Sequence, residues 1–194
     1  MKAATTAADR IADAAVDQLC LHGAAGLTVA AVATAAGISS ALVHYHFESR
    51  QGLLRAAAER LGAARVARRT EPLAGSGLDA IDAVRLALEA EANSGAERAW
   101  HGLLYLGKDD PLLRSIVGRY RDAEAVRLAE RLPSLLRSLG AFSALAPHQL
   151  AAMVRAALDG FALALATGAP RDTVRSAYDA FWLVVIGAGQ SARP

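Results

Sequence analysis

Residues 28–54 read TVAAVATAAGISSALVHYHFESRQGLL, and this stretch carries the clearest structural signals in the sequence. Thr28 and Ser39 are residue types that cap helix N-termini, so we expect two short helices over 28–36 and 39–45. Gly37 lies in the three-residue turn between them and can adopt a left-handed backbone at no steric cost. Two short helices joined by such a turn have the dimensions of a helix-turn-helix motif.

A longer helix is predicted on each side of this pair. Upstream, apolar residues at positions 11, 15 and 19 form one stripe of a helix over 4–22, which Gly23 ends. Downstream, Ser49 caps a helix over 50–69. The first third of the chain is therefore expected to be helical throughout.

Five more helices are expected in the rest of the chain. Their predicted ranges are 78–93, 96–107, 110–138, 147–167 and 171–189. Pro133 should kink the third of these or end it early. The segment 71–77, EPLAGSG, is the best candidate for a boundary because it is rich in Gly, Pro and Ser. The pattern predicts an all-α protein of about nine helices.

The composition supports this fold class. Alanine, the best helix former, occupies 47 of the 194 positions, and aromatic residues make up only 5%. A β-sandwich or barrel needs more β-branched and aromatic residues. A hydrophobic content of 54% and a net charge of +2 exclude an intrinsically disordered chain.

A cytoplasmic location is expected. The apolar stretch 149–167 contains Arg155 and Asp159, which are costly at bilayer depth. The N-terminus lacks the continuous apolar core of a secretory signal. Cys20, the single cysteine, can form neither an internal disulfide nor a cysteine-based zinc site by itself.

Charge is distributed unevenly along the chain. Residues 1–70 carry eight Lys/Arg and five Asp/Glu, whereas residues 71–194 carry thirteen and fourteen. A basic N-terminal third on a near-neutral remainder is typical of a nucleic-acid-binding module joined to another domain. Chance variation among solvated helix faces explains the same numbers equally well.

The N-terminal stretch resembles the DNA-binding signature of the TetR family of bacterial transcriptional regulators. That signature has a Thr-led helix, an Ala-Gly-Val-Ser turn, a recognition helix ending in an aromatic cluster, and a Ser-Lys-x-x-Leu-Leu start to the next helix. The residues that match it here are Thr28, Val32, Ala33, Ala36, Gly37, Ile38, Ser39, Phe47, Ser49, Arg50, Leu53 and Leu54.

Three positions depart from the signature. Ala30 stands where many members carry a basic residue, Arg50 replaces the usual lysine, and 43–47 read VHYHF instead of the commoner LYHYF order. The C-terminal part resembles the BetI-type ligand-binding branch of the family more weakly, through Trp100, the 110–114 segment DPLLR and the 158–161 segment LDGF. The resemblance implies a DNA-binding domain over 1–54 and a ligand-binding and dimerisation domain over 55–194.

A DNA-binding surface is expected around the predicted recognition helix, with the N-terminal part of that helix in the major groove. The helix contains no Lys or Arg, so hydroxyl, imidazole and phenol groups have to read bases or hold phosphates. The candidate DNA-binding residues are Thr28, Ser39, Ser40, Ala41, His44, Tyr45, His46 and Arg50. Capping alone explains Thr28, and packing against the first helix is the alternative for both histidines. Their i, i+2 spacing places them on different helix faces, so no metal site is expected.

A mostly apolar effector pocket is expected in the C-terminal part, lined by some of the few large side chains. The candidate ligand-binding residues are Trp100, His101, Leu104, Tyr105, Phe142, Met153, Asp159, Phe161 and Trp182. Asp159 suits a cationic ligand or an arginine partner, and ordinary core packing is the alternative for the others. No cofactor is expected.

The helices over 147–167 and 171–189 are apolar on more than one side, which favours burial or a partner. The resemblance implies that they form the interface of a homodimer that reads a palindromic operator. It also implies a repressor that a small effector releases from DNA, with the helix over 50–69 as the lever. A small all-α enzyme or carrier is the main alternative, but no G-x-S-x-G, H-E-x-x-H or phosphate-loop motif supports an enzyme. An activator of the same fold is a further alternative. Neither the effector nor the operator can be read from the sequence.

Overall fold

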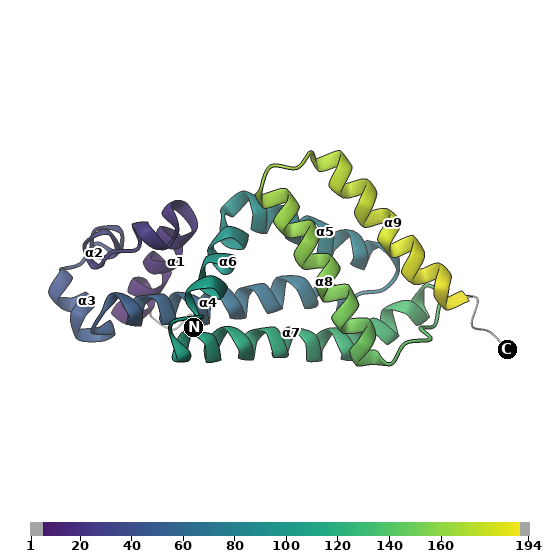
Figure 1. Cartoon of the computed structure of the whole chain (residues 1–194), viewed down its shortest axis with the longest axis horizontal. Helices are drawn as coiled ribbons and strands as arrows, with labels where there is room; N and C mark the ends of the chain where they lie inside the picture. Colours follow the sequence, from purple (N-terminus) through teal and green to yellow (C-terminus); the bar gives the residue numbers. More distant parts are fainter. Residues whose placement is uncertain (1–5, 191–194) are drawn as a thin grey trace. The chain divides into compact units, whose positions relative to one another are not determined.

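The computed structural model describes residues 6–190, which form nine α-helices and one short 3-10 helix (Figure 1). The helices are α1 Ala7–Gly26, α2 Val29–Ala36, α3 Ser40–Phe47, α4 Arg50–Thr70, η1 Pro72–Ala74, α5 Gly77–Ser94, α6 Ala96–Leu106, α7 Pro111–Ser138, α8 Pro147–Ala166 and α9 Arg171–Gln190. This range contains no strand, so the all-α prediction is confirmed.

Local capping chemistry accounts for the helix boundaries in the first third. The Thr6 hydroxyl accepts a hydrogen bond from the Asp9 amide, and the Asp9 carboxylate accepts one from the Thr6 amide, which makes a capping box for α1. The backbone of α1 leaves the helical region at Gly23, where φ is 66°. The predicted break at this glycine is therefore confirmed, although a last helical turn follows it.

Two details of the helix prediction differ from the structure. α3 extends two residues beyond the predicted 39–45 range and ends at Phe47. α7 continues through Pro133 to Ser138, in agreement with the predicted 110–138 range, so of the two effects expected of Pro133 the early end is wrong. A proline removes only one N–H from a helix, and leucines 132, 135 and 136 are fully buried around it. Tertiary packing outweighs the local penalty.

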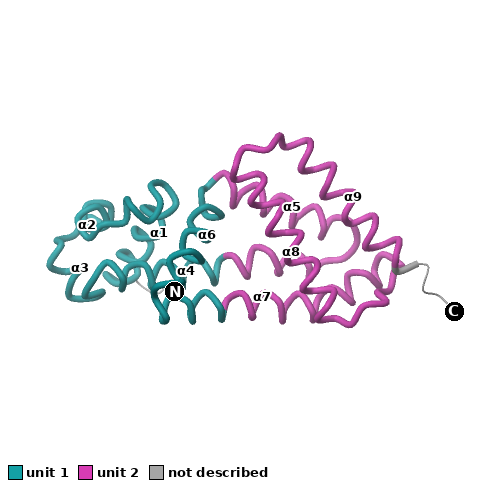
Figure 2. Tube along the Cα trace, viewed as in Figure 1, with its two compact units in different colours: residues 1–64, 94–119 teal, residues 65–93, 120–194 magenta. Residues whose placement is uncertain are grey.

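The chain divides into two compact units (Figure 2). Unit 1 comprises residues 1–64 and 94–119, and unit 2 comprises residues 65–93 and 120–194. Helices α4 and α7 contribute residues to both units. Each unit is thus formed by two separate stretches of chain. The division into a DNA-binding domain over 1–54 and a ligand-binding domain over 55–194 stays a prediction about function.

Unit 1 has a small core centred on α1. Helix α1 packs against α2, α3 and α6. The fully buried residues of this unit include Ile11, Ala15, Leu27, Val32, Leu53, Ala57 and Leu103. Alanine and glycine permit close approach here, since a Cβ at Gly95 would lie 2.3 Å from the Cys20 carbonyl oxygen.

Unit 2 has a larger core built from α5, α7, α8 and α9. It includes Leu88, Leu132, Val154, Leu158, Tyr178 and Trp182. Leu73, in the short η1 helix, is also part of this core. The segment 71–77 therefore does not separate the compact units, because a buried leucine fixes it within unit 2.

Candidate functional site

The helix-turn-helix in unit 1 is built as the sequence indicated. The Thr28 hydroxyl accepts a hydrogen bond from the Ala31 amide, and the Ser39 hydroxyl accepts one from the Leu42 amide. Gly37 adopts a left-handed conformation with φ 66° and ψ 40°. Its amide and that of Ile38 bond to carbonyls of the last turn of α2. These bonds hold α2 and α3 in a defined mutual orientation.

α3 buries one residue and exposes a polar face. Val43 is 1% exposed and anchors the helix in the core of unit 1, while Tyr45 is 80% exposed. The other exposed positions at and along α3 are Ser39, Ser40, Ala41, His44 and His46. Every candidate DNA-binding residue on α3 is accordingly accessible, and Phe47 is partly buried.

His44 has a defined hydrogen-bonding partner. Its Nδ1 lies 3.1 Å from the Glu48 carbonyl oxygen, which can only accept. Nδ1 therefore carries the hydrogen, and Nε2 of the neutral ring is left as an acceptor. An acceptor here suits the exocyclic amino groups of adenine or cytosine. The Tyr45 and His46 rings meet edge to face, with centroids 5.1 Å apart.

The two candidates that flank α3 differ in their surroundings. Thr28 is exposed and caps α2, so its hydroxyl has both a structural bond and access to solvent. Arg50 is partly buried, and its guanidinium donates to the carbonyl oxygens of Leu27 (2.9 Å) and Ala24. A cation at these carbonyls stabilises the C-terminal end of α1. The guanidinium thus has a structural role that the sequence did not indicate.

A strained turn links α3 to α4. Glu48 has φ 58° and ψ −46°, and it is the only non-glycine residue with positive φ among the described residues. The Ser49 amide donates to the Phe47 carbonyl across it, which makes a γ-turn of the rare, strained type. A Cβ at Gly52 would lie 2.0 Å from that same carbonyl oxygen. The exit from α3 therefore tolerates little change in backbone geometry.

The basic residues of the N-terminal third are mostly used inside the protein. In unit 1, Arg55 makes a bidentate ion pair with Asp110, and Arg60 pairs with Asp9 (2.6 Å) and Asp13 (3.2 Å). Divided by compact unit, the sequence has nine Lys/Arg and eight Asp/Glu in unit 1, and twelve and eleven in unit 2. The basic N-terminal third does not correspond to a strongly basic unit.

Arginines recur along α4 at every fifth residue from Arg50 to Arg65. Five residues advance the side chain by about 140° around a helix. Successive arginines therefore point in different directions, and each meets a different part of the fold. Arg65 is the one member of this series that belongs to the polar network of unit 2, so the spacing by itself does not predict that network.

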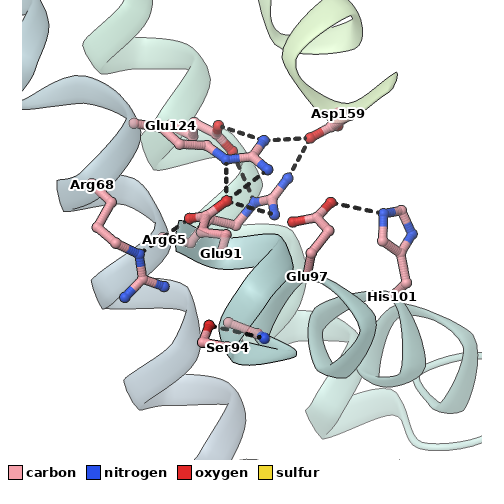
Figure 3. A network of polar contacts seen from close by, with 10 residues as sticks. Arg65, Arg68, Glu91, Ser94, Glu97, His101, Glu124 and Asp159 are labelled. Atoms are coloured by element: carbon pink, nitrogen blue, oxygen red, sulfur yellow. Dashed lines mark hydrogen bonds and ion pairs between the residues drawn. The ribbon is translucent and has the colours of Figure 1, made fainter. Parts of the chain in front are cut away.

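A buried ionic network occupies unit 2 (Figure 3). Arg69 is fully buried, and its guanidinium contacts Glu91 on α5 at 2.9 Å and Asp159 on α8 at 2.7 Å. Arg65 also pairs with Asp159. Arg68, on the outer side, donates to Glu91 at 3.2 Å. Because a buried charge is costly when unpaired, removing one partner of this network should be strongly destabilising.

Glu124 on α7 is the least well satisfied member of the network. One carboxylate oxygen lies 3.6 Å from Arg65 Nε and the other 3.6 Å from Arg69 Nη1. The latter oxygen, Oε1, accepts no hydrogen bond from the described residues. Burial raises the pKa of this carboxyl above its ordinary value, and the two arginines only partly oppose that shift.

Four candidate ligand-binding residues lie on α6 in unit 1. Trp100 is buried, Leu104 is partly buried and Tyr105 is exposed, with the Lys108 ammonium 4.7 Å from its ring centre. His101 Nε2 lies 3.0 Å from the carboxylate of the buried Glu97. These four side chains thus have different environments instead of forming one lining.

The other five candidates lie in unit 2. Phe142 and Met153 are exposed, Asp159 belongs to the ionic network, and Trp182 is buried. Phe161 and Trp182 are members of an aromatic cluster that is completed by Tyr178 and Phe181, with neighbouring ring centres 5.4–6.3 Å apart. The aromatic residues are therefore concentrated between α8 and α9.

Three hollows are found within the units. In unit 1, an open hollow of about 330 Å³ lies between the start of α4 and the α6–α7 turn. In unit 2, a groove of about 260 Å³ between α5 and α9 is lined in part by Trp182, and a hollow of about 10 Å³ is lined in part by Phe161. Trp182 and Phe161 are thus the only candidate ligand-binding residues that line one of these three hollows.

α8 is the one helix in the described range that is long and apolar enough to cross a membrane. Only 28% of its most apolar window is buried. An exposed stripe of small and apolar residues accounts for this, formed by Ala152, Ala156, Gly160 and Leu163. A similar exposed stripe on α9 is formed by Ala177, Ala180 and Val184.

One comparison with known proteins concerns the N-terminal part of the chain. Residues 11–57 match the family model of bacterial regulatory proteins of the tetR family. These residues cover most of α1, the helix-turn-helix and the start of α4. No curated protein sequence matches the chain.

Solved structures share the fold over nearly the full length. A proposed TetR-family transcriptional regulator from Rhodococcus sp. is 24% identical with a TM-score of 0.75, covering 93% of this chain and 98% of its own. A transcriptional regulator from Rhodococcus sp. Rha1 is 22% identical with a TM-score of 0.73, covering 97% and 100%. A proposed transcriptional regulator from Saccharomonospora viridis, solved in complex with choline, is 20% identical with a TM-score of 0.68, covering 90% and 94%.

Proposed function

We propose that this protein is a TetR-family transcriptional regulator that binds operator DNA through α3. The observation that carries the proposal is the helix-turn-helix itself. The family match covers it, both caps and the left-handed glycine are in place, and the polar face of α3 is exposed. A recognition helix with an exposed polar face is what major-groove readout requires.

Direct readout on this face uses neutral groups. Ser39, Ser40 and Tyr45 offer hydroxyls for phosphates and base edges, His44 offers Nε2 as an acceptor, and Ala41 suits a thymine methyl. His46 and Thr28 lie at the margins, where phosphate contacts are common. Arg50 acts mainly by fixing α4 against α1, since its guanidinium bonds to carbonyls there.

The regulator is a homodimer in this proposal. The exposed stripes on α8 and α9 consist of small and apolar residues at helical spacing, which allow two helices to approach closely. Pairing them with the same stripes of a second copy would bury an apolar surface that is otherwise costly to expose. Such a symmetric dimer presents two recognition helices about 34 Å apart and reads a palindrome.

The regulator is a cytoplasmic repressor that a small effector releases. One structural neighbour was solved with choline, which supports ligand binding by proteins of this fold. Effector and operator must weaken each other's binding by the same factor, typically about 5–150-fold. We also propose that the C-terminal part belongs to the BetI-type branch of the family. An activator differs only in the transcriptional outcome, and in vitro transcription with added protein separates the two.

The proposal is tested by DNA binding. Fluorescence anisotropy with the DNA upstream of the protein's own gene should show saturable binding to a palindrome. Tyr45→Ala should weaken this binding about tenfold, or roughly 1.4 kcal/mol. Tyr105→Ala is the matched control, because Tyr105 is also an exposed tyrosine of unit 1 but lies on α6. Absence of binding at low salt would favour the carrier or enzyme alternative.

A further inference from the structure

The groove between α5 and α9 in unit 2 has a shape and lining that suit a small molecule. Its volume is about 260 Å³, close to the lower end of ligand pockets. Apolar side chains form most of it. Leu78 and Leu183 are 65% and 71% exposed at its edges, and Tyr178 and Trp182 are the deepest residues. Together these two leucines provide an apolar contact area at the rim of the groove.

Two carboxylates complete this lining. Asp82 on α5 and Asp179 on α9 both line the groove, and no Lys or Arg does. Both lie close enough to the Tyr178 phenol to oppose its ionisation. That phenol donates a 2.6 Å hydrogen bond to the Ile81 carbonyl and is occupied structurally. The exposed polar groups that the groove offers to a ligand are therefore carboxylate oxygens, and the indole N–H of Trp182 is a buried donor without a partner among the described residues.

The two carboxylates are differently engaged by neighbouring arginines. Arg85 lies 2.6 Å from Asp82, and it also contacts Glu89 on the next turn. Asp179 has only a 4.0 Å approach to Arg175, and both side chains are more than half exposed. An exposed pair at this distance contributes little. Asp179 can therefore accept a cation from a ligand without losing a strong partner.

We propose that this groove binds a small organic cation with an apolar body. The apolar body would displace water from Leu78, Leu183 and Ile186, and the cationic group would lie between Asp82 and Asp179. An anion of the same size would be repelled chiefly by Asp179, which lacks a close arginine partner, and a neutral molecule would gain only the apolar contact. Binding itself does not depend on the proposed regulatory function. The further role as effector rests on that proposed function.

The test uses three probes with one body and different charge: 4-phenylbutylamine, 4-phenylbutanol and 4-phenylbutyrate. Isothermal titration of the full-length protein at pH 7 should show that the ammonium binds at least tenfold more tightly than the alcohol. Binding of the carboxylate should be weakest. Equal binding of amine and alcohol would overturn the proposal.

Two variants locate the site. Asp179→Asn should weaken amine binding about fivefold and leave alcohol binding unchanged. Leu183→Ser should weaken both probes, and because Leu183 is exposed the variant should fold. Glu130→Gln on α7 is the control, since it removes an exposed acid of unit 2 that does not line the groove. An equal loss with Glu130→Gln, or none with Asp179→Asn, would contradict the proposed site.

A second copy of the chain is the competing occupant of the groove. If a dimer covers it, Leu183→Ser will shift the oligomeric state in analytical ultracentrifugation and amine binding will not be detected, which overturns the proposal. The proposed DNA-binding function can be tested separately from amine binding, because operator binding is measured without any amine. Amine binding that leaves operator affinity unchanged would remove the effector role while retaining the site. Loss of operator binding altogether would instead contradict the proposed function.

Discussion

The exposed face of α3 and the second half of α4 use charge in opposite ways. α3 exposes hydroxyl, imidazole and phenol groups and has no Lys or Arg, although it is the candidate DNA-binding surface. The second half of α4 has three arginines, two of them buried against carboxylates from other helices. The comparison shows that a count of basic residues near a helix-turn-helix does not measure how many cations its exposed face carries. Four predictions test this difference between α3 and α4.

The largest expected effect concerns Arg69. Arg69→Met should destabilise the protein by about 3–5 kcal/mol, because it leaves the buried carboxylates of Glu91 and Glu124 with less compensation. Arg60→Met removes a pair whose side chains are more than a third exposed and should cost less than about 1 kcal/mol. Urea denaturation measures both. Similar losses for the two variants would mean that the buried and exposed arginines of α4 are equivalent.

The pH dependence of two carboxyl groups should have opposite signs. Hydrogen bonds, first that from the Leu113 amide, and the Arg55 guanidinium lower the pKa of Asp110. Its contribution to stability is therefore present above the ordinary carboxyl pKa and is lost as pH falls through the lowered value. Burial raises the pKa of Glu124, so its contribution is present in acid and is lost as pH rises through the raised value.

Thermal unfolding of Asp110→Asn and Glu124→Gln between about pH 2 and 8 checks these signs. The deficit of Asp110→Asn relative to the natural chain should be complete above the ordinary carboxyl pKa and should shrink as pH falls below it. Glu124→Gln should instead gain stability relative to the natural chain as pH rises above the ordinary carboxyl pKa. Parallel curves for the two variants would show that the network of unit 2 fully compensates the buried Glu124.

The salt dependence of operator binding tests whether the arginines of α4 stay with their internal partners. With few cations at the DNA surface, the slope of log K against log salt should be shallower than about −4 for a dimer. Ser40→Lys adds one exposed cation per subunit and should steepen the slope by about 2. A slope of about −6 or steeper for the natural chain would show that internal arginines move to phosphates.

The smallest expected effect concerns the strained turn after α3, where Glu48 has positive φ. Glu48→Gly should stabilise the protein by about 0.5–1 kcal/mol, because glycine adopts positive φ without the steric cost. Ala63→Gly, at an exposed position in the interior of α4, is the control and should destabilise by about 1 kcal/mol. Chemical denaturation distinguishes the two signs. Loss of stability in both variants would show that the backbone at Glu48 is not strained.

Much of the fold was predictable because its signals are local. Thr28, Gly37 and Ser39 act on backbone groups three to five residues away, so their effects do not depend on the rest of the chain. The helix-turn-helix and the all-α class were accordingly expected from these residues. The sequence could not separate the ligand candidates from core residues. Trp100 and Tyr105 are both large aromatic residues of one predicted helix, yet Trp100 is buried and Tyr105 is exposed.

The sequence by itself determined the helix-turn-helix and the start of most helices, because caps, turns and helical periodicity are short-range effects. Tertiary structure alone decided what the charges do. Arg69 meets Asp159 across 90 positions of chain, and Arg55 meets Asp110 across 55. Ion pairing depends on distance in space and on burial, which the order of residues does not state. The same reason places Asp82 and Asp179, 97 residues apart in sequence, along one groove.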